Sequence, residues 1–178
     1  MTKEQLHLKK VLRRRIKYVV EKGSIARLFK KGRNTQLQDD FINLLMPSKI
    51  KKLRTREQFD RWLMRIMKKR RWNKYSRNGI MKDRWAYFAK VINIIVYEIV
   101  SNRELIPYTD WQRLNKFLHI PLDHSILKKL SKHNSNFHAP RSLKGMSCED
   151  YLKIQERIRE IAKKMKYPPI WLEDEWTS

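Results

Sequence analysis

Residues 84–100 read RWAYFAKVINIIVYEIV, the most apolar helical stretch of the 178-residue chain. Its large apolar side chains recur three to four residues apart, which is the period of one face of an α-helix. Val91, Val96 and Val100 widen that face, and Asp83 is placed to cap the helix. The pattern predicts a central core helix whose buried face carries Trp85, Phe88, Ile92, Ile95 and Ile99.

Outside this stretch the same helical spacing recurs, and no segment shows sustained strand alternation with hairpin turns. The chain has only four glycines and six prolines, fewer turn residues than a β-rich fold usually needs. We therefore predict an all-α, multi-helix bundle in one domain, 1–178. In the first half of the chain we expect helices at 2–22, before Gly23, and at 25–30, a helix capped by Thr35 and ended by Pro47, and a helix that begins with a capping box of Thr55 and Gln58. In the second half we expect a short helix after Asp110, a helix at 124–132 that is capped by Asp123, and a long helix from Ser147.

The charge of the chain is high and uneven. Lys and Arg number 42 against 18 Asp and Glu, a formal net charge of +24. Residues 1–90 hold 28 cations and 7 acids, a net of +21, whereas residues 91–178 hold 14 and 11, a net of +3. Repulsion of this size is relieved when a polyanion binds and its counterions are released. The composition predicts a nucleic-acid partner that is bound mainly by the basic N-terminal half.

Three basic runs supply the candidate phosphate contacts: on the first helix, after Pro47, and at the end of the helix that Thr55 opens. One such run is often only a solvated face, but three within 71 residues favour phosphate binding. Trp72 and Tyr75 follow the third run, where a nucleobase can stack on an exposed ring while cations hold phosphates. Trp62 and Trp85 fit apolar stripes and are expected in the core. The predicted nucleic-acid-binding residues are Arg13, Arg14, Lys51, Lys52, Lys68, Lys69, Arg70, Arg71, Trp72, Tyr75, Arg77, Gly79, Lys82 and Arg84.

Two residues are candidates for chemistry. Lys90 interrupts the apolar core helix, on a face that is more polar than the isoleucine face. A lysine held among apolar groups and other cations loses its proton more readily and becomes a nucleophile, whereas the alternative is a lysine that extends its amine to solvent. Asp123 follows Ile120-Pro121-Leu122. It either only caps the next helix or is a carboxylate held by that helix and directed at a site.

The segment FAKVINIIVYEIV, followed after a loop by IPLDHSIL, resembles the core of the helix-hairpin-helix DNA glycosylases. It is most similar to their archaeal 8-oxoguanine glycosylase/lyase branch, in which a lysine early in an apolar helix precedes an Ile-Pro-x-Asp element. The resemblance spans residues 84–132 and implies two small helical lobes. It also implies that Lys90 is a Schiff-base nucleophile and that Asp123 positions the amine and stabilises positive charge on the sugar.

The activity implied by this resemblance is that of an N-glycosylase and abasic-site lyase. Such an enzyme acts on a damaged base, 8-oxoguanine being one candidate, that is flipped out of double-stranded DNA, and it needs no metal or organic cofactor. The family's hairpin is glycine-rich, but here only Gly79, within SRNGIMKD, shortly precedes the lysine. The hairpin is therefore reduced, replaced by Lys82 and Arg84, or absent. A non-enzymatic, basic nucleic-acid-binding protein, RNA- or ribosome-associated or architectural, is the alternative; a helical subunit of a phage-defence or mobile-element nucleoprotein is a third.

Several other classes are disfavoured. Cys148 is the single cysteine, which excludes an intramolecular disulfide and a zinc site of paired cysteines. His119 and His124 flank Asp123 as candidates to line the same pocket, but the histidine spacing matches no metal motif. No apolar run or signal peptide indicates a membrane, so we expect a monomer in the reducing cytoplasm, associated with the nucleoid. The acidic tail 173–175 is expected to fold back on basic surface.

Overall fold

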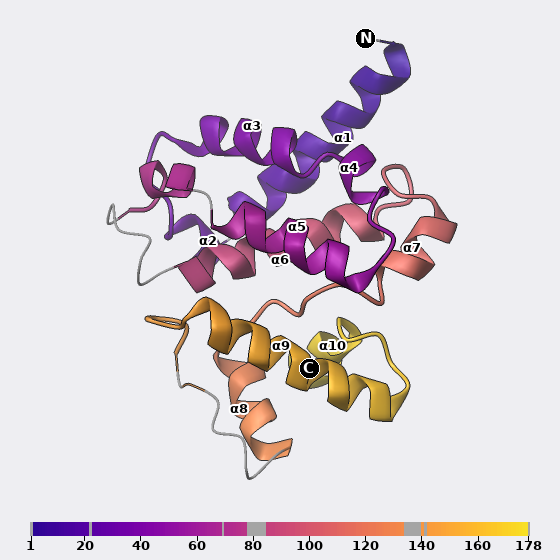
Figure 1. Cartoon of the computed structure of the whole chain (residues 1–178). Helices are drawn as coiled ribbons and strands as arrows, with labels where there is room; N and C mark the ends of the chain where they lie inside the picture. Colours follow the sequence, from indigo (N-terminus) through magenta and orange to yellow (C-terminus); the bar gives the residue numbers. More distant parts are fainter. Residues whose placement is uncertain are drawn as a thin grey trace.

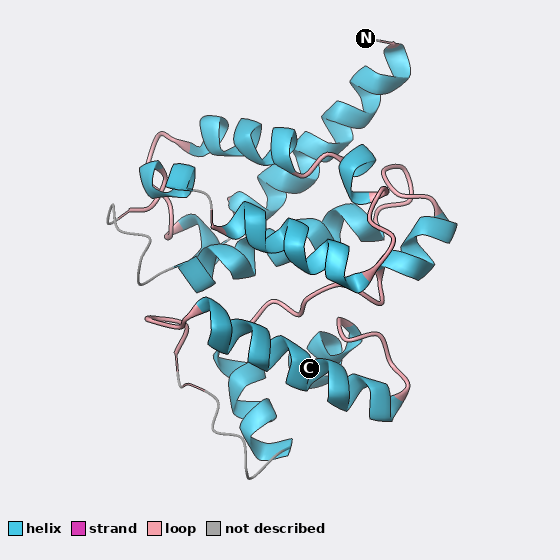
Figure 2. Ribbon diagram, viewed as in Figure 1, coloured by secondary structure: helices cyan, strands magenta, loops and turns pink. Residues whose placement is uncertain are grey.

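A computed structural model of the chain describes residues 2–21, 23–68, 70–77, 85–133, 140 and 142–177. Within these ranges the protein is all-helical (Figure 2), which confirms the predicted fold class; the one extended pairing there is a bridge between Phe29 and Ser76. The elements are α1 (Lys3–Val20), α2 (Gly23–Ala26), α3 (Asn34–Leu44), α4 (Pro47–Ile50), α5 (Arg56–Met67), the 3₁₀ helix η1 (Arg70–Lys74), α6 (Trp85–Ser101), α7 (Tyr108–Leu114), α8 (His124–His133), α9 (Cys148–Met165) and α10 (Trp171–Thr177).

Helix α6 is the predicted central helix. It contacts α1, α5 and α7, and most of its side chains are buried, including the whole of its isoleucine face. Figure 1 shows α1 to α7 as one group, with α8, α9 and α10 (orange to yellow) as a second group below it. The buried apolar side chains of both groups nevertheless form one continuous core. The two groups are therefore packed together rather than joined by a linker alone.

The predicted caps Thr55 and Asp123 are confirmed, and Ser147, the predicted start of the last long helix, is its cap residue. The Thr55 hydroxyl accepts a hydrogen bond from the Gln58 N–H at 3.3 Å, and the Ser147 hydroxyl accepts one from the Asp150 N–H at 3.0 Å. The predicted capping box is only half formed, because the Gln58 side chain accepts from the Arg54 N–H at 2.8 Å and not from that of Thr55. Asp123 Oδ1 accepts from the third N–H of α8 at 3.0 Å. Each cap satisfies a backbone donor that has no partner within its helix, which is why short polar side chains mark these three starts in the sequence.

Three predicted boundaries are wrong. Helix α2 ends at Ala26 rather than continuing to residue 30, because the following residues are drawn into backbone pairing with the segment around Ser76. Helix α3 begins at Asn34 without a side-chain cap, so Thr35 lies inside it. Helix α7 begins before Asp110, at Tyr108, directly after its N-cap residue Pro107. The expected Asp83 cap lies outside the described residues.

A polar network crosses the core between α5, α6 and α9. Arg159 donates to both carboxylate oxygens of Asp60, at 2.7 and 3.0 Å, and His119 Nε2 lies 2.8 Å from Asp60 Oδ1. The other ring nitrogen of His119 lies 2.8 Å from the Tyr151 hydroxyl, to which the Asn93 amide donates at 2.7 Å. A neutral His119 that donates to Asp60 and accepts from Tyr151 has a partner for both of its ring nitrogens. Within the described residues, the Nε of Arg159 is the one buried polar side-chain atom of this network that has no partner. The network thereby ties α9 to α5 and α6.

Candidate active site

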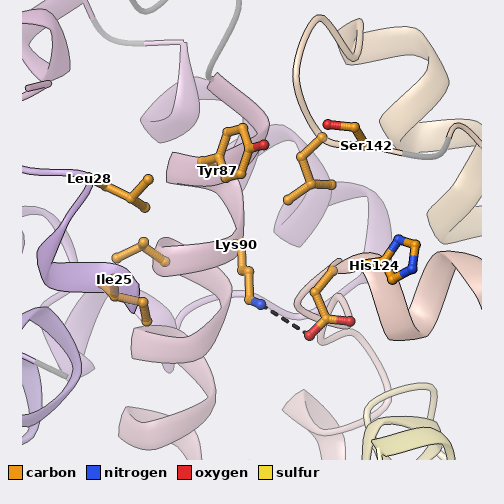
Figure 3. Close-up of a pocket in the computed structure, with 9 residues that line it drawn as sticks. Ile25, Leu28, Tyr87, Lys90, His124 and Ser142 are labelled. Carbon is orange, nitrogen blue, oxygen red and sulfur yellow. Dashed lines mark hydrogen bonds and ion pairs between the residues drawn. The ribbon is translucent and has the colours of Figure 1, made fainter. Parts of the chain in front are cut away.

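Lys90 and Asp123 meet at one pocket. Lys90 projects from α6, Asp123 is the residue that caps α8, and Lys90 Nζ lies 3.1 Å from Asp123 Oδ2 (dashed line in Figure 3). The pocket is a cavity of about 290 Å³, close to the lower limit for ligand sites. The two residues most strongly implicated in chemistry by the sequence are therefore brought together. The cavity is lined by Ile25, Leu28, Tyr87, Lys90, Val91, Asp123, His124, Ser142 and Leu143.

Local structure holds both groups while leaving them accessible. Lys90 stands on a rigid helix whose opposite face is buried in the core, and its side chain is 25% exposed. The Asp123 carboxylate uses one oxygen for the α8 cap and the other for Lys90, and its side chain is 33% exposed. A pair held by packed helices and still open to solvent is preorganised to meet a ligand.

The electrostatics of the pair favour an ionised Asp123. Burial acts to raise the pKa of this carboxyl, but the backbone N–H of Ile126 and the positive charge of Lys90 outweigh burial and lower it. Because Asp123 is a carboxylate at neutral pH, it holds the Lys90 amine in place by a charge-assisted hydrogen bond. The same negative charge can stabilise a cation that develops beside Lys90.

The acidic tail supplies a third carboxyl near this pair. Residues 171–177 form α10, which packs against α8 with the buried Trp176 ring stacked on His133. Burial, helped by the neighbouring Asp174, raises the pKa of Glu173 to about 7, while the charge of Lys90 acts in the opposite direction and that of Asp123 in the same direction. Glu173 is thus within electrostatic reach of the Lys90 pair, which the apolar spacing of this tail does not reveal.

The rest of the pocket comes from segments far apart in the chain. Figure 3 shows Ile25 and Leu28 on one side of Lys90, Tyr87 beside it on α6, and His124 and Ser142 on the other side. His124 lines the pocket as expected, but His119 does not, because it is fully buried in the Asp60 network. The place of Tyr87 in the pocket could have been predicted from the sequence, because Tyr87 precedes Lys90 by about one helical turn and so lies beside it on α6.

The prediction that Trp72 and Tyr75 stack on nucleobases is wrong. Trp72 is 0% exposed and Tyr75 is 1% exposed, so neither ring can receive a nucleobase. The Trp72 ring is stacked on Phe41, and its Nε1 donates to the Ile66 carbonyl at 2.7 Å. The basic residues around them suggested a solvated loop, but the rings close the core beneath that segment. Trp62 and Trp85, expected in the core, are partly buried against it.

The predicted phosphate-binding residues differ in exposure and in ion pairing. Arg14, Lys52, Lys68 and Arg77 are exposed, and Lys51 is partly exposed. Arg13 forms an ion pair with Asp39 at 2.5 Å, so a phosphate would have to compete with this carboxylate for the guanidinium. The backbones of Arg70 and Arg71 form part of η1, and nothing is described of their side chains. Lys69, Gly79, Lys82 and Arg84, and with them the expected hairpin, lie outside the described residues.

Comparison with known proteins gives no family: no family model, no curated protein and no solved structure matches this chain. In the described part of the chain, no group of His, Cys, Asp and Glu side chains is arranged to hold a metal ion. Among those same residues, no helix combines the length and apolarity needed to cross a membrane.

Proposed function

We propose that this protein binds DNA and acts as an N-glycosylase and abasic-site lyase, with Lys90 as the nucleophile and Asp123 as the residue that assists it. A damaged base such as 8-oxoguanine, flipped into the pocket, is the proposed substrate. The reaction needs no metal or organic cofactor. The observation that carries the proposal is the 3.1 Å pair of Lys90 and Asp123 at the edge of a concave pocket.

This pairing is more specific than either residue alone. A lysine on a helix face normally extends into water, and an aspartate before a helix normally only caps it. Here the cap directs its second oxygen toward a lysine that comes from another helix, 33 residues earlier in the chain. The Tyr87 ring lies in the same pocket and offers a flipped base an aromatic neighbour.

The chemistry would proceed in balanced steps. The amine of Lys90, having released one proton to solvent, attacks C1′, and the glycosidic bond breaks with its electron pair leaving on the base, which takes up a proton. Opening of the sugar ring leaves an imine between Nζ and C1′, known as the Schiff base. Loss of a C2′ proton then expels the 3′ phosphate with the C3′–O electron pair. Water hydrolyses the imine and regenerates the amine.

Asp123 has two roles in this sequence. Before attack it fixes the position of the amine, and during attack its negative charge stabilises the positive charge that develops on the sugar. Its lowered pKa makes it a weak proton acceptor, so it acts through its charge and its position. Asp123→Asn is therefore expected to slow the covalent step more than it weakens DNA binding.

Borohydride trapping tests the proposal. Duplexes that carry either 8-oxoguanine or an abasic site are incubated with the protein, and hydride reduction of the imine fixes the complex covalently. We expect a trapped complex with the unmodified protein and none with Lys90→Gln, because glutamine has no nucleophilic amine. Lys128→Gln is the matched control, since Lys128 is an exposed lysine on α8 near Asp123.

Trapping by Lys90→Gln at the unmodified rate would rule out Lys90 as the nucleophile. Loss of trapping in Lys128→Gln as well would show that the assay reports charge rather than the Schiff base.

A non-enzymatic nucleic-acid-binding protein is the second candidate function, favoured by the net charge of +24. It predicts tight, salt-sensitive binding to DNA or RNA with little sequence preference. In that case neither duplex is trapped, and Lys90→Gln changes binding no more than Lys128→Gln does.

A further inference from the structure

We propose that Arg61 and Arg65 on α5 and Lys68, the C-cap residue of that helix, form a phosphate-binding stripe that holds a DNA strand and leads it to the Lys90 pocket. The stripe lines a groove between α5 and α9 with a volume of about 690 Å³. Binding of DNA here does not require the lyase chemistry; only the direction of the strand toward Lys90 rests on the proposed function.

The spacing of the stripe suits a strand that runs along the helix. Residues 61, 65 and 68 are four and three apart, so they share one face of α5, and they extend over about 10 Å of helix axis. All three side chains are exposed, on the face of α5 that borders α9. The groove is lined by Asp60, Arg61, Met64, Arg65, Lys68, Leu152, Lys153, Glu156 and Arg159.

The three cations of the stripe are available to bind a phosphate, whereas several cations on α1 are already paired with carboxylates. Arg65 and Lys68 have no ion-pair partner among the described residues, and Arg61 uses only its Nε, which donates to the carbonyl of Glu57 at 3.3 Å. On α1, by contrast, Arg13 is paired with Asp39 and Arg15 with Glu98. A phosphate at the α5 stripe does not have to displace a carboxylate.

The acids in the groove are already neutralised. Asp60 is held by the bidentate Arg159, and Glu156 accepts from Arg56 at 3.3 Å and from Arg159 at 3.4 Å. Lys153, on the α9 side, is paired with the exposed Glu149 at 2.8 Å. The remaining local charge is positive, and a concave positive surface concentrates a polyanion.

A short segment connects the groove to the pocket. Ser142 and Leu143 line the Lys90 pocket, and a few residues later Cys148 Sγ lies 3.6 Å from Met64 Sδ on α5. Between them, the Met146 carbonyl accepts from Trp85 Nε1 at 2.6 Å, which fixes the segment to the start of α6. In Figure 1, α5 and α9 lie side by side, and the end of α5 lies on the same side as the start of α9. A strand on the stripe can thus continue past residues 142–148 toward Lys90.

The test is the salt dependence of DNA binding by the full chain. The variant Arg61→Gln/Arg65→Gln/Lys68→Gln is compared with Lys163→Gln/Lys164→Gln/Lys166→Gln, which removes three exposed cations at the far end of α9. The probe is a fluorescent duplex with a central tetrahydrofuran abasic analogue, titrated across a series of KCl concentrations. Because each neutralised phosphate contributes about 0.9 to the slope of log K against log salt, the stripe variant should lose about 2.7 of slope and the control almost none.

Equal loss of slope in both variants, or no loss in either, would overturn the stripe. Circular dichroism checks that both variants are folded, and the single variant Arg65→Gln should lose about a third of the effect. Failure of the proposed function is read separately. If the unmodified protein binds this duplex but is never trapped by borohydride on the 8-oxoguanine or abasic-site duplexes, the lyase fails while the stripe stands. If the unmodified protein does not bind the duplex, both proposals fail.

Discussion

Replacing Asp60 by Asn should destabilise the protein strongly at neutral pH and much less in acid. Asp60 accepts two hydrogen bonds from Arg159 and one from His119, and the three side chains are only 22%, 10% and 0% exposed. Asparagine keeps the shape of the side chain but removes the negative charge. The amide also cannot accept a hydrogen bond at both of its terminal atoms, so Arg159 is left partly unpaired.

The size of the loss follows from the pKa of Asp60. Burial acts to raise this pKa, but the hydrogen bonds from His119 and Arg159 outweigh burial and lower it from 3.8 to about 2. That difference corresponds to about 2 kcal/mol of stability at pH 7, and removing one partner of a buried pair costs about 3 to 5 kcal/mol. We expect Asp60→Asn to lower the free energy of unfolding by about 2 to 5 kcal/mol.

The pH dependence has a definite sign. A carboxyl whose pKa is lowered in the folded state contributes stability above its unfolded pKa, and that contribution disappears as pH falls through the folded pKa. The part of the difference that is linked to this pKa, about 2 kcal/mol, should therefore be constant from pH 7 to about 5 and fall by about half near pH 3. Urea denaturation at several pH values measures it, with Glu57→Gln, an exposed acid on the same helix, as control. A loss below about 1 kcal/mol, or a loss independent of pH, would refute the assigned role of Asp60.

Three further predictions concern other parts of the chain. Glu173→Gln should gain stability relative to the unmodified protein as pH rises from 4.5 through 7, because the raised pKa of about 7 makes ionised Glu173 unfavourable in the folded state. Thermal unfolding at a series of pH values measures this gain, and Glu175→Gln, at an exposed position, is the control. The same pH dependence of stability in both variants would contradict the prediction. Trp72→Ala should lower the free energy of unfolding by about 3 to 5 kcal/mol, as measured in urea, while the DNA affinity of the folded molecules stays unchanged; weakened affinity would restore a contact role for this ring. Ser147→Ala should cost about 1 kcal/mol through the lost α9 cap, and an unchanged urea midpoint would show that the cap is dispensable.

The buried tryptophan shows where reasoning from sequence fails. Trp72 follows four consecutive basic residues, and local composition cannot distinguish an exposed aromatic among cations from one that turns inward. Its burial depends on Phe41, thirty-one residues away, and on the carbonyl that accepts its Nε1 proton. The pattern of residues 68–77 predicts neither contact. The same limit applies to His119, which has the sequence environment of a pocket residue and the structure of a core residue.

The sequence by itself determined the helical class, the central helix and its buried face, the caps at Thr55 and Asp123, and the start of the last long helix at Ser147. These features depend on periodicity and on hydrogen bonds within four residues, which are local physics. The choice of Lys90 and Asp123 as partners depended instead on the resemblance of residues 84–132 to a known family. Only the tertiary structure decided that Lys90 and Asp123 lie 3.1 Å apart, that Glu173 approaches them, and that α5 and α9 enclose a basic groove. Those features depend on contacts between residues far apart in the chain, and their distances follow from how the whole core packs.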